Sequence, residues 1–223
     1  MRGEDRIQLG KMHHPVRGFL HGTAAVVALV GAVLLPSLTP GSAWRRLALL
    51  VFGLSLVGLF TVSSLYHSIP WGERWKERMR RLDHTMIYVL VAGTFTPIAA
   101  IVLDGWLRWL TLGMQWGIVL IGTLHKYRAA HPHRVLSVAL QMTQGWLAIF
   151  LLWPLKERLP WTALLLMGLG GVFYTVGMVF LVTNRPRLWP RVFSYHEVFH
   201  VLVVAASAVH FAMITAYVAR FGV

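Results

Sequence analysis

Long apolar runs, separated by short polar and basic segments, make up nearly the whole 223-residue chain. A helix needs about 20 apolar residues, at 1.5 Å each, to cross the hydrocarbon core of a bilayer. The pattern predicts seven such spans, at residues 19–36, 47–68, 83–103, 109–124, 135–155, 161–183 and 197–219. We therefore expect an all-α fold, a seven-transmembrane helix bundle.

The composition also favours a protein that lies in the membrane. Of its residues, 57% are hydrophobic and only 13% are charged. A soluble domain of this size could not bury so many apolar side chains. No linker or internal repeat divides the chain, so residues 1–223 should form a single membrane domain that includes a short cytoplasmic tail at 1–17. The net charge of +13 falls in clusters between the spans, which argues against nucleic acid as a partner.

The positions of lysine and arginine set the expected orientation. With the N-terminus inside, 15 of the 21 basic residues fall in cytoplasmic segments and the other six in external ones. Basic loops favour the cytoplasmic side of a membrane. The N-terminus should therefore be cytoplasmic, and the C-terminus, after an odd number of spans, extracytoplasmic.

Four ionisable residues lie at the inner ends of three spans. His67 ends the second span, Asp83 opens the third, and His196 and His200 lie at the start of the seventh. The alternating topology places all four at one depth, just inside the cytoplasmic face of the membrane. Ionisable residues within spans are uncommon and often functional, so these four are the main candidates for a site.

The spacing of His196 and His200 suits a metal ion. Residues four apart lie on one face of a helix, about 6 Å apart along its axis. The chain has no cysteine, so a metal would be held by histidine or carboxylate, and His67 is the natural third ligand. Three histidines and one water are a common catalytic zinc set, in which Asp83 could hydrogen-bond the water.

Several of these residues have structural alternatives. Asp83 could instead cap the third helix or pair with an arginine just before it. Ser63, one turn from His67 on the same face, could support the metal or contact substrate, or it could bond to its own helix backbone. His84 lies about 100° from Asp83 around the helix and should face a neighbouring span or headgroups. His210 could line a cavity or bond to a neighbouring helix, and its role stays open.

The segment HEVFH, at residues 196–200, matches the H-E-x-x-H signature of zinc proteases. In an intramembrane protease, Glu197 would be the base, and the aspartate of an L-D-G motif would be the third ligand. Asp104 lies in such a motif, but on the outer side, about 30 Å from the histidine pair. We therefore do not expect a protease, and Glu197 could equally be an interfacial carboxylate.

The segments SSLYHS, DHTMIYVLVAGTFTP and HEVFH, in this order, resemble the three motifs of hemolysin III proteins. These are the bacterial branch of the progestin and adipoQ receptor family, within a wider group that includes alkaline ceramidases. The resemblance covers nearly the whole chain. It implies seven spans around a zinc ion, with His67, His196 and His200 as ligands, Asp83 on the bound water and Ser63 nearby.

The resemblance leaves the activity open between two classes. One is a zinc-dependent, ceramidase-like hydrolase of a lipid amide or ester, with zinc-bound water as the nucleophile. The other is a non-enzymatic protein of membrane homeostasis, or a receptor-like, pore-forming or cytolytic protein, in which a structural zinc links the second and seventh spans. In both, we expect a membrane lipid as substrate or ligand, and a bacterial inner membrane with the metal near its cytoplasmic face. The sequence determines neither the substrate nor the oligomeric state.

Overall fold

The computed structural model describes residues 12, 14–129, 133–189 and 192–222 of the chain. Within these ranges, seven helical segments are long and apolar enough to cross a membrane, which confirms an all-α, seven-span integral membrane protein. Three of the spans consist of two consecutive helical elements. The elements are α1 (Pro15–Leu38), α2 (Ala43–Ser68), α3 (Glu73–Pro97) with η2 (Ile98–Val102), α4 (Gly105–Arg128), α5 (Arg134–Trp146) with α6 (Ala148–Lys156), α7 (Trp161–Thr183), and α8 (Tyr195–Met213) with η3 (Ile214–Val218).

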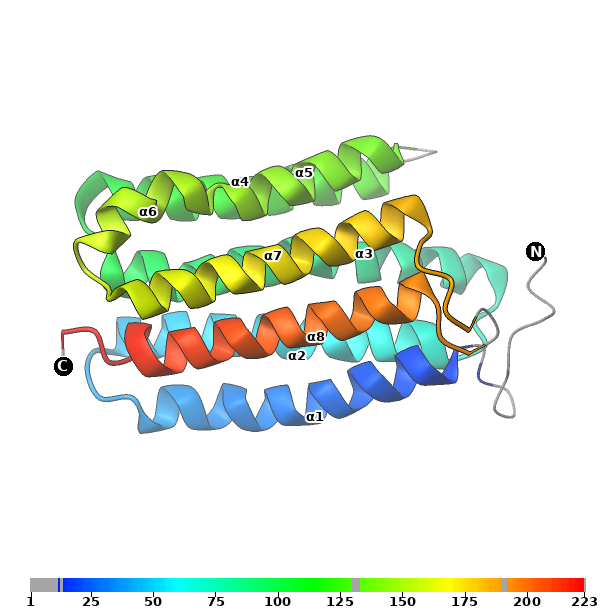
Figure 1. Cartoon of the computed structure of the whole chain (residues 1–223), viewed down its shortest axis with the longest axis horizontal. Helices are drawn as coiled ribbons and strands as arrows, with labels where there is room; N and C mark the ends of the chain where they lie inside the picture. The colour runs from blue at the N-terminus through cyan, green and yellow to red at the C-terminus, as the bar shows by residue number, and fades with distance from the viewer. Residues whose placement is uncertain (1–11, 13, 130–132, 190–191, 223) are drawn as a thin grey trace.

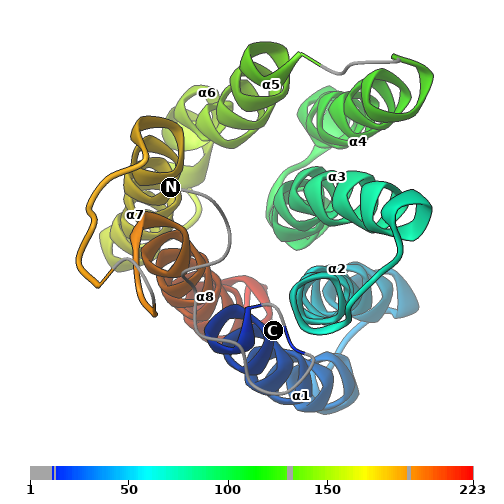
Figure 2. The same ribbon diagram turned by 90° about the vertical axis from the view of Figure 1, so that its right-hand side faces the viewer.

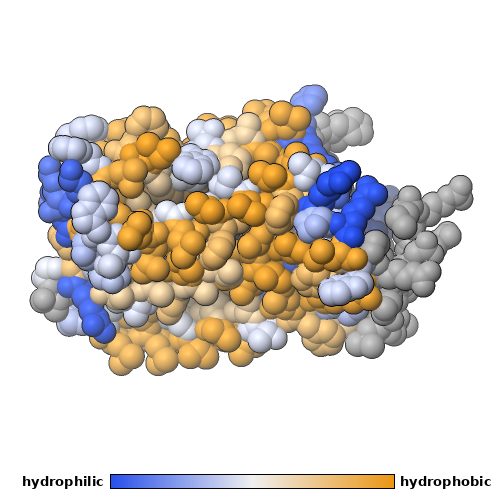
Figure 3. Space-filling view, in the orientation of Figure 1, coloured by the Kyte–Doolittle hydropathy of each residue, from blue (hydrophilic) through white to orange (hydrophobic). Residues whose placement is uncertain are grey.

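The helices lie side by side along one long axis, and the start of α1 and the end of α8 are at opposite ends of the bundle (Figure 1). Viewed along that axis they form a ring, with α1 to α4 on one side and α5 to α8 on the other (Figure 2). On the face shown in Figure 3, apolar residues cover the middle of the molecule, and hydrophilic residues gather towards both ends. Such a continuous apolar surface is what contact with lipid requires.

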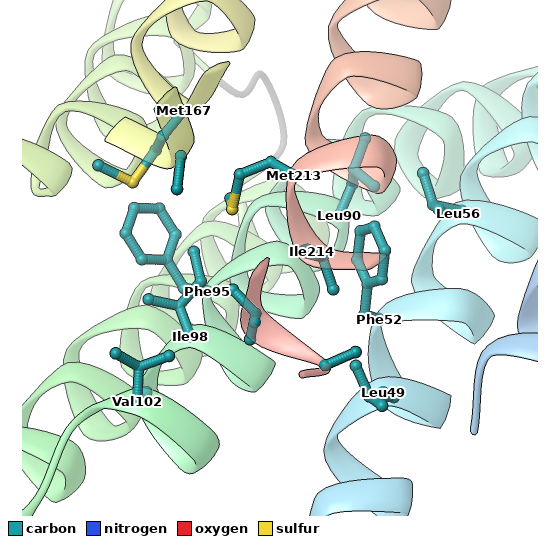
Figure 4. Close-up of a cluster of buried hydrophobic side chains, with 14 of the residues drawn as sticks. Leu49, Phe52, Leu56, Leu90, Phe95, Ile98, Val102, Met167, Met213 and Ile214 are labelled. Carbon is teal, nitrogen blue, oxygen red and sulfur yellow. The ribbon is translucent and has the colours of Figure 1, made fainter. Parts of the chain in front are cut away.

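A hydrophobic core lies between the helices of this ring. Phe52 and Leu56 from α2, Phe95 from α3 and Met213 from α8 belong to one buried cluster (Figure 4). Phe52 precedes His67 by 15 residues on α2, which separates them by about 22 Å along the helix. Phe199 belongs to the same cluster and lies against His200, with ring centroids 5.6 Å apart, so the core extends from this region up to the predicted histidine site.

The third span starts earlier than the apolar pattern predicts, because α3 begins at Glu73. Residues 73–82 are too polar for lipid but form a regular helix, in which Glu77 pairs with Arg80 (2.7 Å) and Arg81 (2.8 Å). Pairs at this spacing stabilise a helix. Asp83 consequently lies inside α3, and the alternative that it caps the helix is wrong, since the cap position is Gly72.

The first helix packs closely against the second near Gly18. A side chain at this position would collide with Oγ of Ser68, and the hydroxyl of Ser64 donates to the carbonyl oxygen of Gly18 (2.8 Å). α1 begins at Pro15, so residues 15–17 of the expected tail are helical, while residues 1–11 and 13 lie outside the described residues. The close packing brings the start of α1 beside the end of α2.

Candidate metal centre

Three histidines meet at the end of the bundle where α2 finishes and α8 begins. One ring nitrogen from each of His67, His196 and His200 lies within 4.8 Å of the other two. The ring centroids are 5.5 Å apart for His67 and His196, 4.9 Å for His67 and His200, and 5.0 Å for His196 and His200. The structure thus brings together the three residues that the sequence predicts as metal ligands.

The start of α8 holds two of these histidines in register. Ser194 and Glu197 form a capping box, in which the backbone N–H of Ser194 donates to Oε2 of Glu197 (2.8 Å). This arrangement satisfies backbone groups that the first helical turn leaves without partners. One turn apart on the helix, the rings of His196 and His200 are nearly parallel, with planes 15° apart.

Two ring nitrogens of the cluster have no hydrogen-bond partner within the described part of the chain. They are Nε2 of His67 and Nε2 of His200, and both atoms are buried. Buried polar atoms are nearly always satisfied, and imidazole nitrogen is a preferred ligand of zinc. The donor set therefore fits a zinc ion held by three imidazoles.

His21 on α1 also belongs to this cluster, although the sequence pattern does not predict it. Its side chain is only 2% exposed, and its Nε2 lies 2.9 Å from Nδ1 of His200. If Nε2 of His200 is to offer a lone pair to a metal, the ring proton must be on Nδ1, and His21 then accepts that N–H. A contact of this kind fixes the tautomer and the orientation of a ligating histidine.

Asp83 and Ser63 lie next to each other in the wall of a cavity beside the histidine cluster. The Ser63 hydroxyl lies close enough to the Asp83 carboxyl to interact with it, and both side chains are buried. His196 and His200 line the same cavity as this pair. The arrangement puts a carboxyl group, held by a neighbouring helix, beside the three predicted ligands; the roles of Asp83 and Ser63 in a reaction stay predictions.

Glu197 forms a buried ion pair with α1. Oε1 of Glu197 lies 2.7 Å from Nε of Arg17, and the two side chains are 3% and 5% exposed. The other carboxylate oxygen accepts the backbone N–H of Ser194. Both oxygens are engaged in holding α8 in place, which does not fit the catalytic base of a protease.

Asp104 lies at the other end of the bundle, between η2 and α4. Its carboxylate pairs with Arg108 (3.1 Å) and with Arg158. The hydrogen bond from Arg158 holds the pKa of the Asp104 carboxyl below its ordinary value. This aspartate is too far from the histidines to be a third ligand, which supports the exclusion of a protease of the H-E-x-x-H type.

Two further histidines contact neighbouring helices. Nδ1 of His84 lies 3.5 Å from Nζ of Lys126 on α4, so His84 faces a neighbouring span, as the sequence predicts. Nε2 of His210 lies 3.2 Å from the carbonyl oxygen of Met167 on α7. His210 thus bonds to a neighbouring backbone and also lines the larger cavity described next.

Two cavities meet at the histidine cluster. The larger has a volume of about 790 Å³, and the smaller of about 260 Å³. Asp83 and His196 line both of them, His200 lines the larger, and His67 lines the smaller. The walls of the larger cavity are mostly apolar and include Leu59, Ile87, Phe95, Met178 and Val203. The candidate metal site therefore separates an apolar cavity from a smaller, more polar one.

Comparison with known proteins gives a consistent set of similarities. A family profile described as haemolysin-III related matches residues 10–211. The hemolysin-3 homolog of Bacillus subtilis (strain 168) is 31% identical over 199 residues, covering 88% of this chain and 90% of the relative. Hemolysin-3 of Bacillus cereus is 31% identical over 200 residues, or 89% and 88% of the two chains. The human monocyte to macrophage differentiation factor is 25% identical over 222 residues, or 93% and 85%.

Proposed function

The chain belongs to the haemolysin III-related family, and we propose that it is a zinc-dependent hydrolase of a lipid amide or ester. The observation that carries this proposal is the position of the three-histidine cluster, at the point where an apolar cavity meets a smaller polar one. A hydrolase of lipids needs room for an acyl chain on one side of its reacting groups and access for water on the other.

His67, His196 and His200 would hold the zinc ion, and the unpartnered Nε2 atoms of His67 and His200 support this assignment. His21 would keep the ring proton of His200 on Nδ1, which leaves Nε2 for the metal. When bound in an open three-histidine site, zinc supplies Lewis acidity, which acidifies a water molecule and polarises a carbonyl oxygen.

Asp83 would act as general base and then general acid. Its carboxylate takes a proton from the attacking water, whose oxygen adds to the acyl carbon. As the C–N or C–O bond breaks, the same proton passes to the leaving amine nitrogen or alcohol oxygen. Ser63 lies beside the carboxyl and would keep it oriented, by a hydrogen bond, through both transfers.

The larger cavity suits the acyl chain of the substrate. Its volume of about 790 Å³ is within the range of pockets that enclose small ligands. Its lining combines aliphatic and aromatic side chains with the few polar groups of the site. A lipid could enter with its acyl chain among the apolar walls and its scissile carbonyl at the histidines.

The expected orientation would place the site near the cytoplasmic face of the membrane. The end of the bundle that holds the histidines also carries Arg74, Arg78, Arg80 and Arg81 of α3, and basic segments favour the cytoplasmic side. Relatives from two Bacillus species support a bacterial inner membrane as the location.

The alternative function, a non-enzymatic protein with a structural zinc between α2 and α8, predicts a coordinatively closed site. The two cavities that reach the cluster favour the enzyme. The buried hydrophobic core between the helices (Figure 4) opposes a continuous aqueous pore. The two Bacillus relatives carry the name hemolysin, and that name does not assign cytolysis to this chain.

The test is hydrolysis of acyl amides and acyl esters by purified protein in lipid–detergent micelles, with released fatty acid as the readout. We expect wild type to release fatty acid and Asp83→Asn to bind zinc normally with turnover reduced about 100-fold or more. Asp104→Asn, at the other end of the bundle, is the matched control and should keep full activity. Equal turnover by wild type and Asp83→Asn would overturn the proposal.

A further inference from the structure

A buried lysine lies in the wall of the larger cavity. Lys126, in the last turn of α4, is 7% exposed. Its Nζ is 3.5 Å from Nδ1 of His84, and it forms no ion pair with any residue that the structure describes. Lysine is almost never fully buried without a partner, because an unpaired charge in a low-dielectric interior is strongly unfavourable.

The surroundings of Lys126 add positive charge. The guanidinium of Arg81 donates to the carbonyl oxygen of Lys126 (2.9 Å), and Arg80 and Arg134 line the same cavity. One nearby carboxylate, Glu77, is already shared between Arg80 and Arg81. The lining has four lysine and arginine residues and two carboxylates, of which the second is Asp83 beside the histidines.

His84 gives Lys126 one possible acceptor nitrogen but no negative charge. A cation buried in this way, with neighbouring arginines and a cavity in front of it, is suited to bind an anion that comes from outside the protein. Lysine is a common ligand of phosphate in this role. The same cavity continues along apolar walls, so the anion would be one end of an amphiphile.

We propose that Lys126 and His84 bind the phosphate of an anionic glycerolipid whose acyl chain occupies the larger cavity. The consequence of this binding rests on the proposed function: the hydrolase would act on a glycerophospholipid or its monoacyl form. His84 follows Asp83 directly on α3, so the phosphate would lie near the Asp83 carboxyl, which would take a proton from the attacking water. In a glycerophospholipid, only the short glycerol unit separates the phosphate from the acyl ester, which matches this proximity.

The test is a binding measurement on the full-length, zinc-containing protein in detergent. The probes are an alkyl glycerophosphate and an alkyl glycerol with the same ether-linked chain, which the proposed hydrolysis cannot cleave. We expect wild type to bind the glycerophosphate about 10- to 100-fold more tightly, the range of a charge-assisted hydrogen bond. Equal affinity for the two lipids would overturn the proposal, whatever the fate of the hydrolase assay.

Two substitutions test whether Lys126 is responsible for the preference for the glycerophosphate. Lys126→Met should abolish the preference for the glycerophosphate and leave binding of the alkyl glycerol unchanged, whereas Lys126→Arg should retain the preference. The control is Lys156→Met, since Lys156 is exposed at the other end of the bundle and lies over the ring of Trp153. An unchanged preference in Lys126→Met would contradict the assignment, as would inorganic phosphate that binds as tightly as the lipid. The preference in wild type tests the proposal even if a variant fails to fold.

Discussion

Nδ1 of His200 on α8 lies 2.9 Å from Nε2 of His21 on α1, so the first and last spans of the bundle meet at the histidine cluster. The contact uses Nδ1 of His200. It leaves Nε2, which has no hydrogen-bond partner among the described residues, to bind a metal. It also connects the cluster to α1, whose start is fixed by close packing on α2 and by the buried pair of Arg17 and Glu197.

We predict that His21→Leu lowers zinc affinity about 10- to 100-fold, the usual effect of removing a hydrogen bond that orients a metal ligand. The measurement is a zinc titration against a competing chelator. His125→Leu is the matched control, because His125 lies outside the cluster, with its Nε2 3.4 Å from the backbone carbonyl oxygen of His133. An equal loss in both variants, or none in His21→Leu, would count against the role of His21.

We predict that Glu197→Gln destabilises the protein by about 3 kcal/mol or more, because it removes the carboxylate charge that pairs with the buried guanidinium of Arg17. Thermal unfolding in detergent measures the effect. Zinc content should persist in folded Glu197→Gln, since Glu197 is not among the predicted ligands. Replacing both Arg17 and Glu197 by methionine should restore much of the lost stability, and a double variant less stable than Glu197→Gln would argue against this explanation.

Gly18 tests the close approach of α1 to α2. We predict that Gly18→Ala destabilises the bundle by about 1–3 kcal/mol, because the added methyl group collides with Oγ of Ser68. Ser68→Ala removes that oxygen and should rescue Gly18→Ala in the same thermal unfolding assay. The explanation fails if Gly18→Ala is as stable as wild type or if the second substitution gives no recovery.

Much of this architecture could be predicted from the sequence. The seven spans follow from the apolar runs, and the convergence of His67 with His196 and His200 follows from counting spans and assigning a common depth. Hydrophobicity, however, predicts only which segments of the chain can lie in lipid. It could not show that α3 continues back to Glu73, because that segment is stabilised by ion pairs such as Glu77 with Arg81.

The contacts made by α1 could not be predicted in the same way. The sequence predicts that Arg17 belongs to a cytoplasmic tail, because of its charge, and His21 is a single polar residue near the start of an apolar run. Their partners, Glu197 and His200, are 180 and 179 residues away in sequence. One signal was present: Arg17 and His21 are four apart, the same spacing as His196 and His200, so both pairs present two polar side chains on one helix face.

The central claim is that the three histidines hold one metal ion, and the most direct measurement is the zinc content of purified protein. Wild type and His67→Ala should be prepared identically, with His125→Ala as a control that keeps the cluster intact. We predict about one zinc ion per chain in wild type and in His125→Ala, and almost none in His67→Ala. A wild-type protein that takes up no zinc, or a His67→Ala variant that retains a full equivalent, would contradict the claim.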